Sequence, residues 1–252
     1  SIRVFGPSEH HNLPSRDFEP EYISSADGKA YATLQENNAI AVIDIESATV
    51  EQVIPAHIAE HSEVPLDSSN KDDVAELRTI PVKGLSMPDS IGAFEAGGQT
   101  YFATANEGDA REWGGYTDEV ELKDLVKDGK VCDDLELPEG IEDKKFAGNL
   151  KLTNASGWNE EKGCFDGLYS YGSRSFSIYD AEGNVVFDSG SDFENITKDM
   201  PGLHFNADNE DPDFDDHSDN KGPEPEALTI GKVGDRTYAF IGAERVGGIF
   251  VY

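Results

Sequence analysis

Short runs of alternating apolar and polar residues recur along the chain, and three of them share one plan. In each copy a proline and an acidic residue precede a short apolar run, a turn that contains glycine, and a strand that begins with tyrosine and ends in glutamate. The copies begin at residues 18–21, 87–89 and 223–226, and their tyrosine-led strands lie at residues 31–36, 101–107 and 238–244. Two alternating runs around a glycine turn predict a β-hairpin. Its reuse along the chain predicts a repeat architecture.

The first copy predicts a complete four-stranded unit. Strands are expected at residues 21–24, 31–35, 39–45 and 50–54, and tight turns join them. Four short strands joined in this way are typical of a propeller blade. A weaker copy covers residues 168–187, with a turn at residues 181–184.

We therefore expect an all-β chain built as a β-propeller of four-stranded blades. A β-sandwich also has short alternating strands, but its strands do not repeat a proline–acid step and a terminal glutamate at matching places. The repeats predict blades at approximately residues 16–57, 84–112, 165–195 and 219–252, with loop insertions at residues 58–83 and 113–164. Long insertions of this kind fall on one face of a propeller and can cover its central funnel.

Length suggests that the propeller is an incomplete portion of a larger one. A blade takes about 40 to 50 residues, so the 252 residues hold about four or five blades, and residues 249–252 read as the middle of a strand. Open blade edges favour self-association. No run approaches the roughly 20 apolar residues of a membrane helix, so any anchor is expected outside this chain.

Charge narrows the range of partners. The net charge is −31, from 51 acidic and 20 basic residues. A nucleic acid needs a basic surface, so nucleic-acid binding is excluded, and cations are the natural counterpart. For most individual acidic residues the plainer interpretation is surface solubility. Cys132 and Cys164 lie in the same loop-rich segment, where they form either a disulfide suited to an oxidising compartment or two reduced thiols.

Acidic residues are densest between residues 206 and 226. Hard cations such as Ca²⁺ bind six to eight oxygens from such groups. The spacing of Asp211, Asp213 and Asp215 resembles the start of an EF-hand, but Asp216 stands where that loop needs glycine. The alternatives are an irregular calcium site and a solvated acidic loop. The metal-ligand candidates are Asp208, Asp211, Asp213, Asp215, Asp219, Glu224 and Glu226.

The repeat itself predicts a second group of residues. Rotation about a propeller axis carries equivalent positions onto a ring, so Glu19, Glu107 and Glu224 are expected to face a common central space. The ring could bind a ligand, or it could consist of ion pairs that fix the register of the blades. The candidates for the central channel are Glu19, Glu21, Glu36, Asn106, Glu107, Asp109, Arg111, Glu244 and Arg245.

Sequence templates for common catalytic sites are missing. The chain has no Gly-x-Ser-x-Gly elbow, no His-Glu-x-x-His pair, no phosphate loop and no Cys-x-x-Cys motif. The sequence therefore does not predict a nucleophilic or zinc-dependent enzyme of these kinds.

Five segments resemble the mesenchyme-specific cell-surface glycoprotein family, also called choice-of-anchor I proteins. They are residues 34–44, 104–111, 174–178, 221–226 and 244–248. The resemblance implies a secreted or surface-tethered propeller of about seven blades when complete. Animal members of the family are associated with calcified matrix, and bacterial relatives are often labelled alkaline phosphatase.

Taken together, these features favour a binding protein outside the cytoplasm, whether extracellular, at the cell surface or periplasmic. The expected ligand is Ca²⁺ and, through it, a surface or matrix partner. One alternative is a metal-dependent phosphoesterase in which Glu19, Glu107, Asp109 and Glu224 hold metals and Arg111 or Arg245 holds phosphate. The other alternative is a purely structural scaffold.

Overall fold

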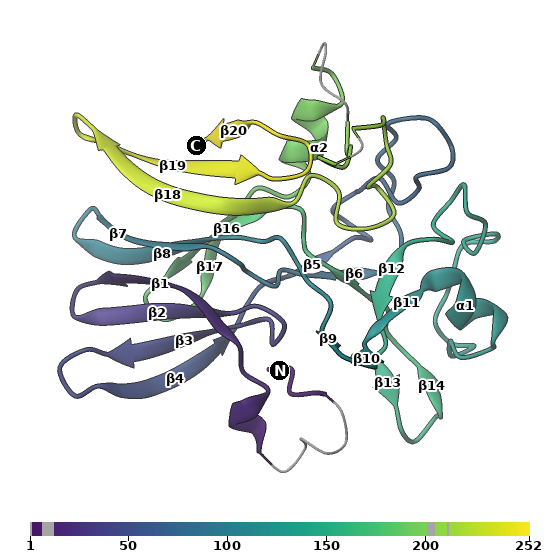
Figure 1. Cartoon of the computed structure of the whole chain (residues 1–252), viewed down its shortest axis with the longest axis horizontal. Helices are drawn as coiled ribbons and strands as arrows, with labels where there is room; N and C mark the ends of the chain where they lie inside the picture. The colour runs from purple at the N-terminus through teal and green to yellow at the C-terminus, as the bar shows by residue number, and fades with distance from the viewer. Residues whose placement is uncertain (1, 7–12, 201–204, 211) are drawn as a thin grey trace.

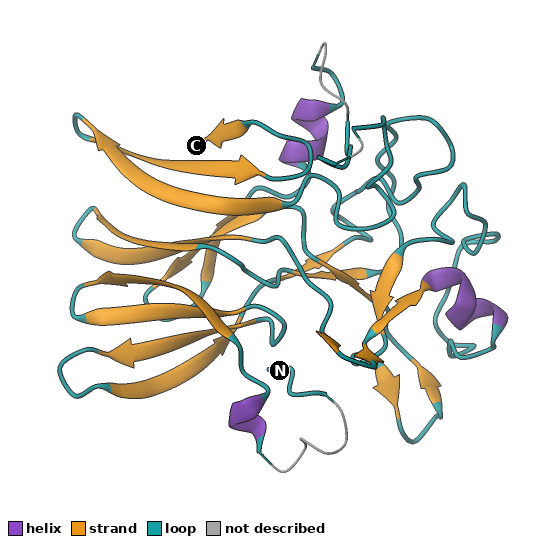
Figure 2. Cartoon of the chain, in the orientation of Figure 1, coloured by secondary structure: helices purple, strands orange, loops and turns teal. Residues whose placement is uncertain are grey.

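Three antiparallel sheets carry the regular part of the fold, as the computed structural model shows (Figure 1). The structure describes residues 2–6, 13–200, 205–210 and 212–252. Strands and loops make up nearly all of it (Figure 2), and the helical elements are short. They are the 3₁₀ helix η1 (Pro14–Arg16) and the α-helices α1 (Leu122–Lys127) and α2 (Asp192–Thr197). The chain is therefore all-β, with four-stranded sheets that resemble propeller blades.

The first sheet follows the chain order β1-β2-β3-β4, as the first repeat predicts. Its strands are β1 (Pro20–Ala26), β2 (Lys29–Leu34), β3 (Ala39–Asp44) and β4 (Thr49–Pro55). Asp27 and Gly28 join β1 to β2 with positive φ angles of 48° and 74°. Two successive positive φ angles fit the tight turn whose twist matches a hairpin.

The second sheet has the order β17-β16-β8-β7 and joins two distant parts of the chain. Its strands are β7 (Ile91–Ala96), β8 (Gln99–Ala105), β16 (Phe176–Asp180) and β17 (Val185–Asp188). Residues 84–112 and 165–195, expected as separate blades, thus contribute one hairpin each to the same sheet. The boundaries differ because alternation reveals each hairpin, whereas the pairing of β8 with β16 is a long-range contact without a local signal.

The third sheet contains β18 (Pro225–Val233), β19 (Arg236–Ala243) and β20 (Ile249–Val251) in chain order. The first strands of the three sheets, β1, β7 and β18, lie next to one another (Figure 1). Stacked rings fill the space between the first two sheets, with centroids 4.7 Å apart for Tyr31 and Phe102 and 5.0 Å apart for Phe102 and Tyr179. Phe176 and Phe193 belong to the core between the second and third sheets.

The segments expected as loop insertions contribute to a fourth, five-stranded sheet with the order β11-β12-β15-β6-β5. Its strands are β5 (Ile58–Glu60), β6 (Lys83–Leu85), β11 (Glu119–Glu121), β12 (Lys151–Thr153) and β15 (Tyr169–Tyr171). Its strand β15 and most of β6 come from residues expected in the blades at 165–195 and 84–112. Two small ribbons are formed by β9 (Glu112–Trp113) with β10 (Tyr116–Thr117) and by β13 (Trp158–Asn159) with β14 (Cys164–Phe165). Strands of two or three residues are too short for alternation to show.

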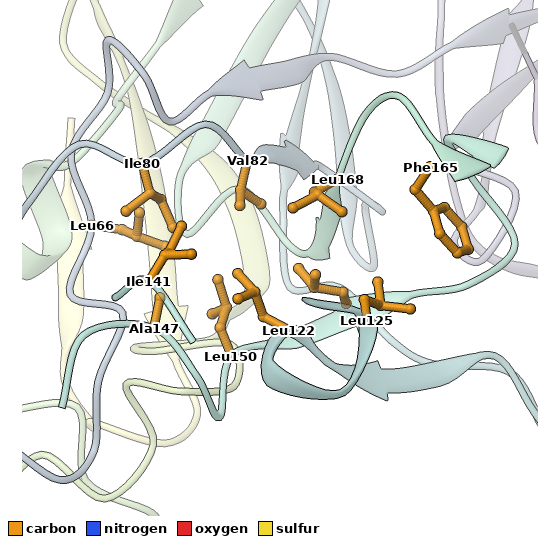
Figure 3. Close-up of a cluster of buried hydrophobic side chains, with 11 residues drawn as sticks. Leu66, Ile80, Val82, Leu122, Leu125, Ile141, Ala147, Leu150, Phe165 and Leu168 are labelled. Atoms are coloured by element: carbon orange, nitrogen blue, oxygen red, sulfur yellow. The ribbon is translucent and has the colours of Figure 1, made fainter. Parts of the chain in front are cut away.

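Residues 58–83 and 113–171, here together called the insertion, have their own hydrophobic core (Figure 3). Leu66, Ile80, Leu122 and Leu150 are among its buried side chains, so segments far apart in sequence meet in it. Cys132 and Cys164 form a disulfide in the insertion. Among the described residues, no helix is long and apolar enough to cross a membrane.

Candidate functional site

An acidic cavity of about 550 Å³ lies where the segments before β1, after β8 and before β18 meet. Acidic side chains outnumber basic ones in its lining. The acidic residues are Glu19, Glu21, Glu36, Asp109, Glu112, Glu119 and Glu224, and the basic ones are His217, Lys221 and Arg245. Walls with one dominant sign of charge focus the field inside a cavity, so this one attracts cations.

Two carboxyl groups face each other in this cavity, those of Glu19 and Glu36. Glu36 follows β2 and is buried, with the Glu19 carboxyl within hydrogen-bonding reach. Burial and then the charge of Glu19 raise the pKa of Glu36 to about 8, although its own backbone N–H and Arg111 act in the opposite direction. No donor among the described residues reaches Glu36 Oε2. Two facing acceptors need a proton or a cation between them.

Arg111 fixes Glu19 from the other side. Its guanidinium is fully buried between the rings of Phe5 and Trp113, 4.4 and 4.6 Å from their centroids. It donates to the backbone oxygens of Phe5 and Asp17, and its Nη2 lies 3.5 Å from Glu19 Oε2. The indole N–H of Trp113 donates to Glu19 Oε1 at 3.0 Å. Arg111 is thus committed to these contacts and is not placed to hold a phosphate.

Glu21 and Asp89 form a second carboxyl pair. Asp89 is buried, and its carboxyl is within hydrogen-bonding reach of Glu21. Burial raises the pKa of Asp89 to about 8, together with Glu21 and the charges of Glu107 and Glu226. Asp109 lies in the mouth of the cavity, where partial desolvation raises its pKa to about 6.

Glu224 is the centre of an ion-pair network and is fully buried. Its oxygens lie 2.7 Å from His217 Nε2, 3.1 Å from Lys221 Nζ and 2.8 Å from Arg245 Nε. Burial alone would raise the pKa of Glu224, but these three groups outweigh it and lower the pKa to about 2. We call Glu224 with these three residues and Glu107 the Glu224 network.

The Glu224 network connects the three main sheets. Lys221 Nζ also lies 3.0 Å from Glu107, which follows β8, and Gln35, which follows β2, donates to Glu107 at 2.9 Å. In the described part of the chain, Glu107, Glu224 and Glu244 are the one place where three acidic side chains bring oxygens within 4.8 Å of one another. Because Lys221 and Arg245 already neutralise two of these carboxylates, ion pairing between sheets accounts for this cluster.

A close crossing of two backbones positions Glu107. Gly108, at φ 88°, lies against Gly172, and a Cβ built on Gly108 would be 2.1 Å from Gly172 N. Only glycine fits this approach without displacing backbone. The crossing brings the end of β8 onto the end of β15, and so places Glu107 and Asp109 beside the insertion.

The other sequence candidates lie in different surroundings. Asn106 directly follows β8 and is buried. Its side-chain amide forms hydrogen bonds with the hydroxyl groups of Thr104, Ser175 and Ser177, so this side chain does not face the cavity. Glu244 is exposed, and its nearest basic partner is Arg245 Nε at 3.4 Å.

The acidic loop before β18 does not gather its carboxylates at one point in the described residues. Asp208 lies 3.4 Å from Arg245 Nη1, Asp213 is exposed, and Asp215 is buried against the insertion. Burial raises the pKa of Asp219 to about 6 and also raises that of Glu226. Asp211 lies outside the described residues.

Sequence reasoning missed several residues of the cavity. His217, Lys221, Trp113 and Tyr171 line it, but none belongs to the repeat positions used to find the ring. Lys221 stands three residues before Glu224, and this short spacing between opposite charges is the sequence feature that could have predicted their ion pair. No sequence feature marks Tyr171 as a cavity residue, because β15 reaches the cavity through pairing with β12 and β6, which are distant in sequence.

Blade-like sheets around an acidic cavity define a chain of the β-propeller class. Over residues 1–252 it matches the model of the choice-of-anchor I domain, and it belongs to that family. Among curated proteins it is similar to gigasin-3a of Magallana gigas, with 35% identity over 111 residues. That match covers 42% of this chain and 39% of gigasin-3a, so the chain spans about two fifths of that relative.

Among solved structures, the quinohemoprotein alcohol dehydrogenase of Comamonas testosteroni aligns with 93% of this chain and 43% of its own. Its TM-score is 0.18 at 10% identity. A score this low does not indicate a shared fold.

Proposed function

We propose that this chain is a binding module of a secreted or surface protein, and that its acidic cavity takes up a divalent cation such as Ca²⁺. One observation carries the proposal: among the described residues the buried Glu36 Oε2 has no donor, and the Glu36 carboxyl lies within hydrogen-bonding reach of the Glu19 carboxyl. Buried acceptors without a partner cost free energy, and a hard cation bound by both carboxylates removes that cost.

The cavity suits such a cation in charge and in size. At about 550 Å³ it has room for water molecules that complete a coordination shell of six to eight oxygens. Asp109 and Glu112 also line the cavity and add negative potential, whereas the charge of Glu119 is balanced by Lys151 at 3.0 Å. A proton competes with the cation for the Glu19–Glu36 pair, so affinity should rise with pH.

A partner would approach from the open side of the cavity. A cation held by Glu19 and Glu36 keeps coordination positions that oxygens of a surface or matrix molecule can fill. The disulfide in the insertion is typical of proteins in oxidising compartments, which supports a location outside the cytoplasm.

Calorimetric titration of the whole chain with CaCl₂ tests this proposal. Glu36→Gln should weaken binding at the cavity at least about tenfold, because it removes one of two ligand charges. Glu46→Gln, at an exposed turn between β3 and β4, is the matched control and should bind as the parent does. Equal affinity in Glu36→Gln and Glu46→Gln would overturn the proposal.

A further inference from the structure

A second group of buried oxygens lies where the loop before β18 packs on the insertion. Asn206 and Asp215 come from this loop and are 0% and 2% exposed. The loop is held in shape by the N–H of Asp215, which donates to Phe205 O at 2.8 Å. Asn70 of the insertion donates to Asp216 O at 3.3 Å, so the two segments are in direct contact.

Three side-chain oxygens in this contact find no donor among the described residues: Asp72 Oδ1, Asn206 Oδ1 and Asp215 Oδ2. The amide orientation of Asn206 is determined by its surroundings, because Nδ2 donates to Glu194 Oε1 at 2.7 Å and to Ser218 Oγ at 2.9 Å. The unpartnered atom is therefore the oxygen.

The groups that carry these oxygens are close together. The Ser218 hydroxyl accepts from Asn206 and donates to Asp215 Oδ1, so one hydroxyl holds both side chains. Asp72 lies two residues after Asn70, which donates to the backbone oxygen of Asp216, the residue that follows Asp215. The charges of Asp67 and Asp72 also act on Asp215, and together with burial they raise its pKa to about 8.

The two nearby arginine side chains already have partners. Arg174 donates to Glu194 at 2.8 Å and to the backbone oxygens of Asp67 and Ser218. Arg78 lies 2.6 Å from the other oxygen of Asp72. Asp72 Oδ1, Asn206 Oδ1 and Asp215 Oδ2 therefore remain without a donor among the described residues, and hard cations bind oxygens of this kind.

We infer that Asp72, Asn206 and Asp215 supply protein ligands to a second divalent cation of the Ca²⁺ class, which ties the insertion to the loop before β18. This site is separate from the acidic cavity and does not depend on the function proposed for it. Its role is structural, since its ligand oxygens are buried and come from two segments far apart in sequence.

Equilibrium dialysis of the whole chain at about 1 mM free Ca²⁺, a level at which extracellular sites are filled, measures both sites. The parent should bind two ions and Asp215→Asn one. Asp213→Asn, an exposed carboxylate two residues away, is the matched control and should keep two. If Asp215→Asn and Asp213→Asn bind equal numbers of ions, the inference is wrong. That is the result expected if a water molecule, and not a cation, fills the contact.

Two further variants keep the outcome unambiguous. Glu36→Gln distinguishes failure of the cavity proposal from failure of this inference. If only the cavity proposal is wrong, the parent binds one ion. Asp215→Asn then loses that ion and Glu36→Gln retains it. Should Asp215→Asn not fold, Asp72→Asn replaces it and should also bind one ion fewer than the parent. Binding unchanged in Asp72→Asn would then contradict the inference.

Discussion

Removing the charge of Glu224 should destabilise the protein, because this buried carboxylate serves three basic groups. In Glu224→Gln, His217, Lys221 and Arg245 lose their common anionic partner. Lys221 keeps Glu107 at 3.0 Å, whereas the acidic partner left to His217 among the described residues is Asp208, at 3.8 Å. The expected result is a lower free energy of unfolding at neutral pH.

The pKa of Glu224 gives the magnitude. It is lowered from 4.5 to about 2, and each unit corresponds to about 1.4 kcal/mol, so the charge contributes about 3 kcal/mol. Since the folded pKa is the lower one, the unfolded chain binds more protons between the two values. The contribution is therefore complete above pH about 4.5 and is lost as the pH falls toward 2.

Urea unfolding at pH 7 with a chelator present measures this loss without a contribution from bound cations. The control is Glu226→Gln, two residues away, where burial and the charges of Glu107 and Glu224 raise the pKa. Removing that charge should leave stability unchanged or slightly higher. The reasoning is refuted if Glu224→Gln lies within about 0.5 kcal/mol of the parent, or if both variants lose the same amount.

Three further predictions follow from single features of the fold. Asp89→Asn should gain between about 3 and 4 kcal/mol of stability relative to the parent as the pH rises from 5 to 8, because the raised pKa of Asp89, about 8, means that the parent loses about 1.4 kcal/mol per pH unit over most of this range. Urea unfolding at several pH values checks this, and a constant difference between the two proteins contradicts it. Replacing Cys132 and Cys164 by alanine should cost about 2 to 4 kcal/mol for a disulfide with a sequence separation of 32, and an unchanged midpoint of denaturation would refute this. Gly108→Ala should lower the free energy of unfolding by about 3 kcal/mol or more, because its Cβ would lie 2.1 Å from backbone, whereas Gly97→Ala, with open space around it, should lower it by only about 1 kcal/mol. Equal shifts of the two melting temperatures would contradict the close crossing of Gly108 and Gly172.

The hairpins were predictable because their information is local. Alternation and paired positive-φ residues such as Asp27 and Gly28 specify β1 and β2, and Gly97 with Gly98 does the same for β7 and β8. The pairing of β8 with β16 was not predictable in this way. This pairing joins strands that are separated by most of the insertion. The patterns of residues 84–112 and 165–195 each predict a separate blade.

Acidic residues of the cavity could be named from repeat positions, but their partners could not. Glu19 and Glu224 do line one cavity. The sequence does not show, however, that basic groups neutralise Glu224 while no donor in the described part of the chain reaches Glu36 Oε2. This difference depends on side-chain placement within a few ångströms. The density of acids between residues 206 and 226 was equally uninformative, since Asp208 and Asp215 point to different surroundings.

Terbium luminescence is the most direct test of a cation between Glu19 and Glu36. Tb³⁺ binds the oxygen ligands that Ca²⁺ prefers, and it emits when an adjacent tryptophan is excited. Because the Trp113 indole donates to Glu19 at 3.0 Å, a cation in the cavity would lie beside this ring. The account predicts emission in the parent and in Trp158→Phe that is lost in Trp113→Phe and in Glu36→Gln. Emission that persists unchanged in Glu36→Gln would contradict it.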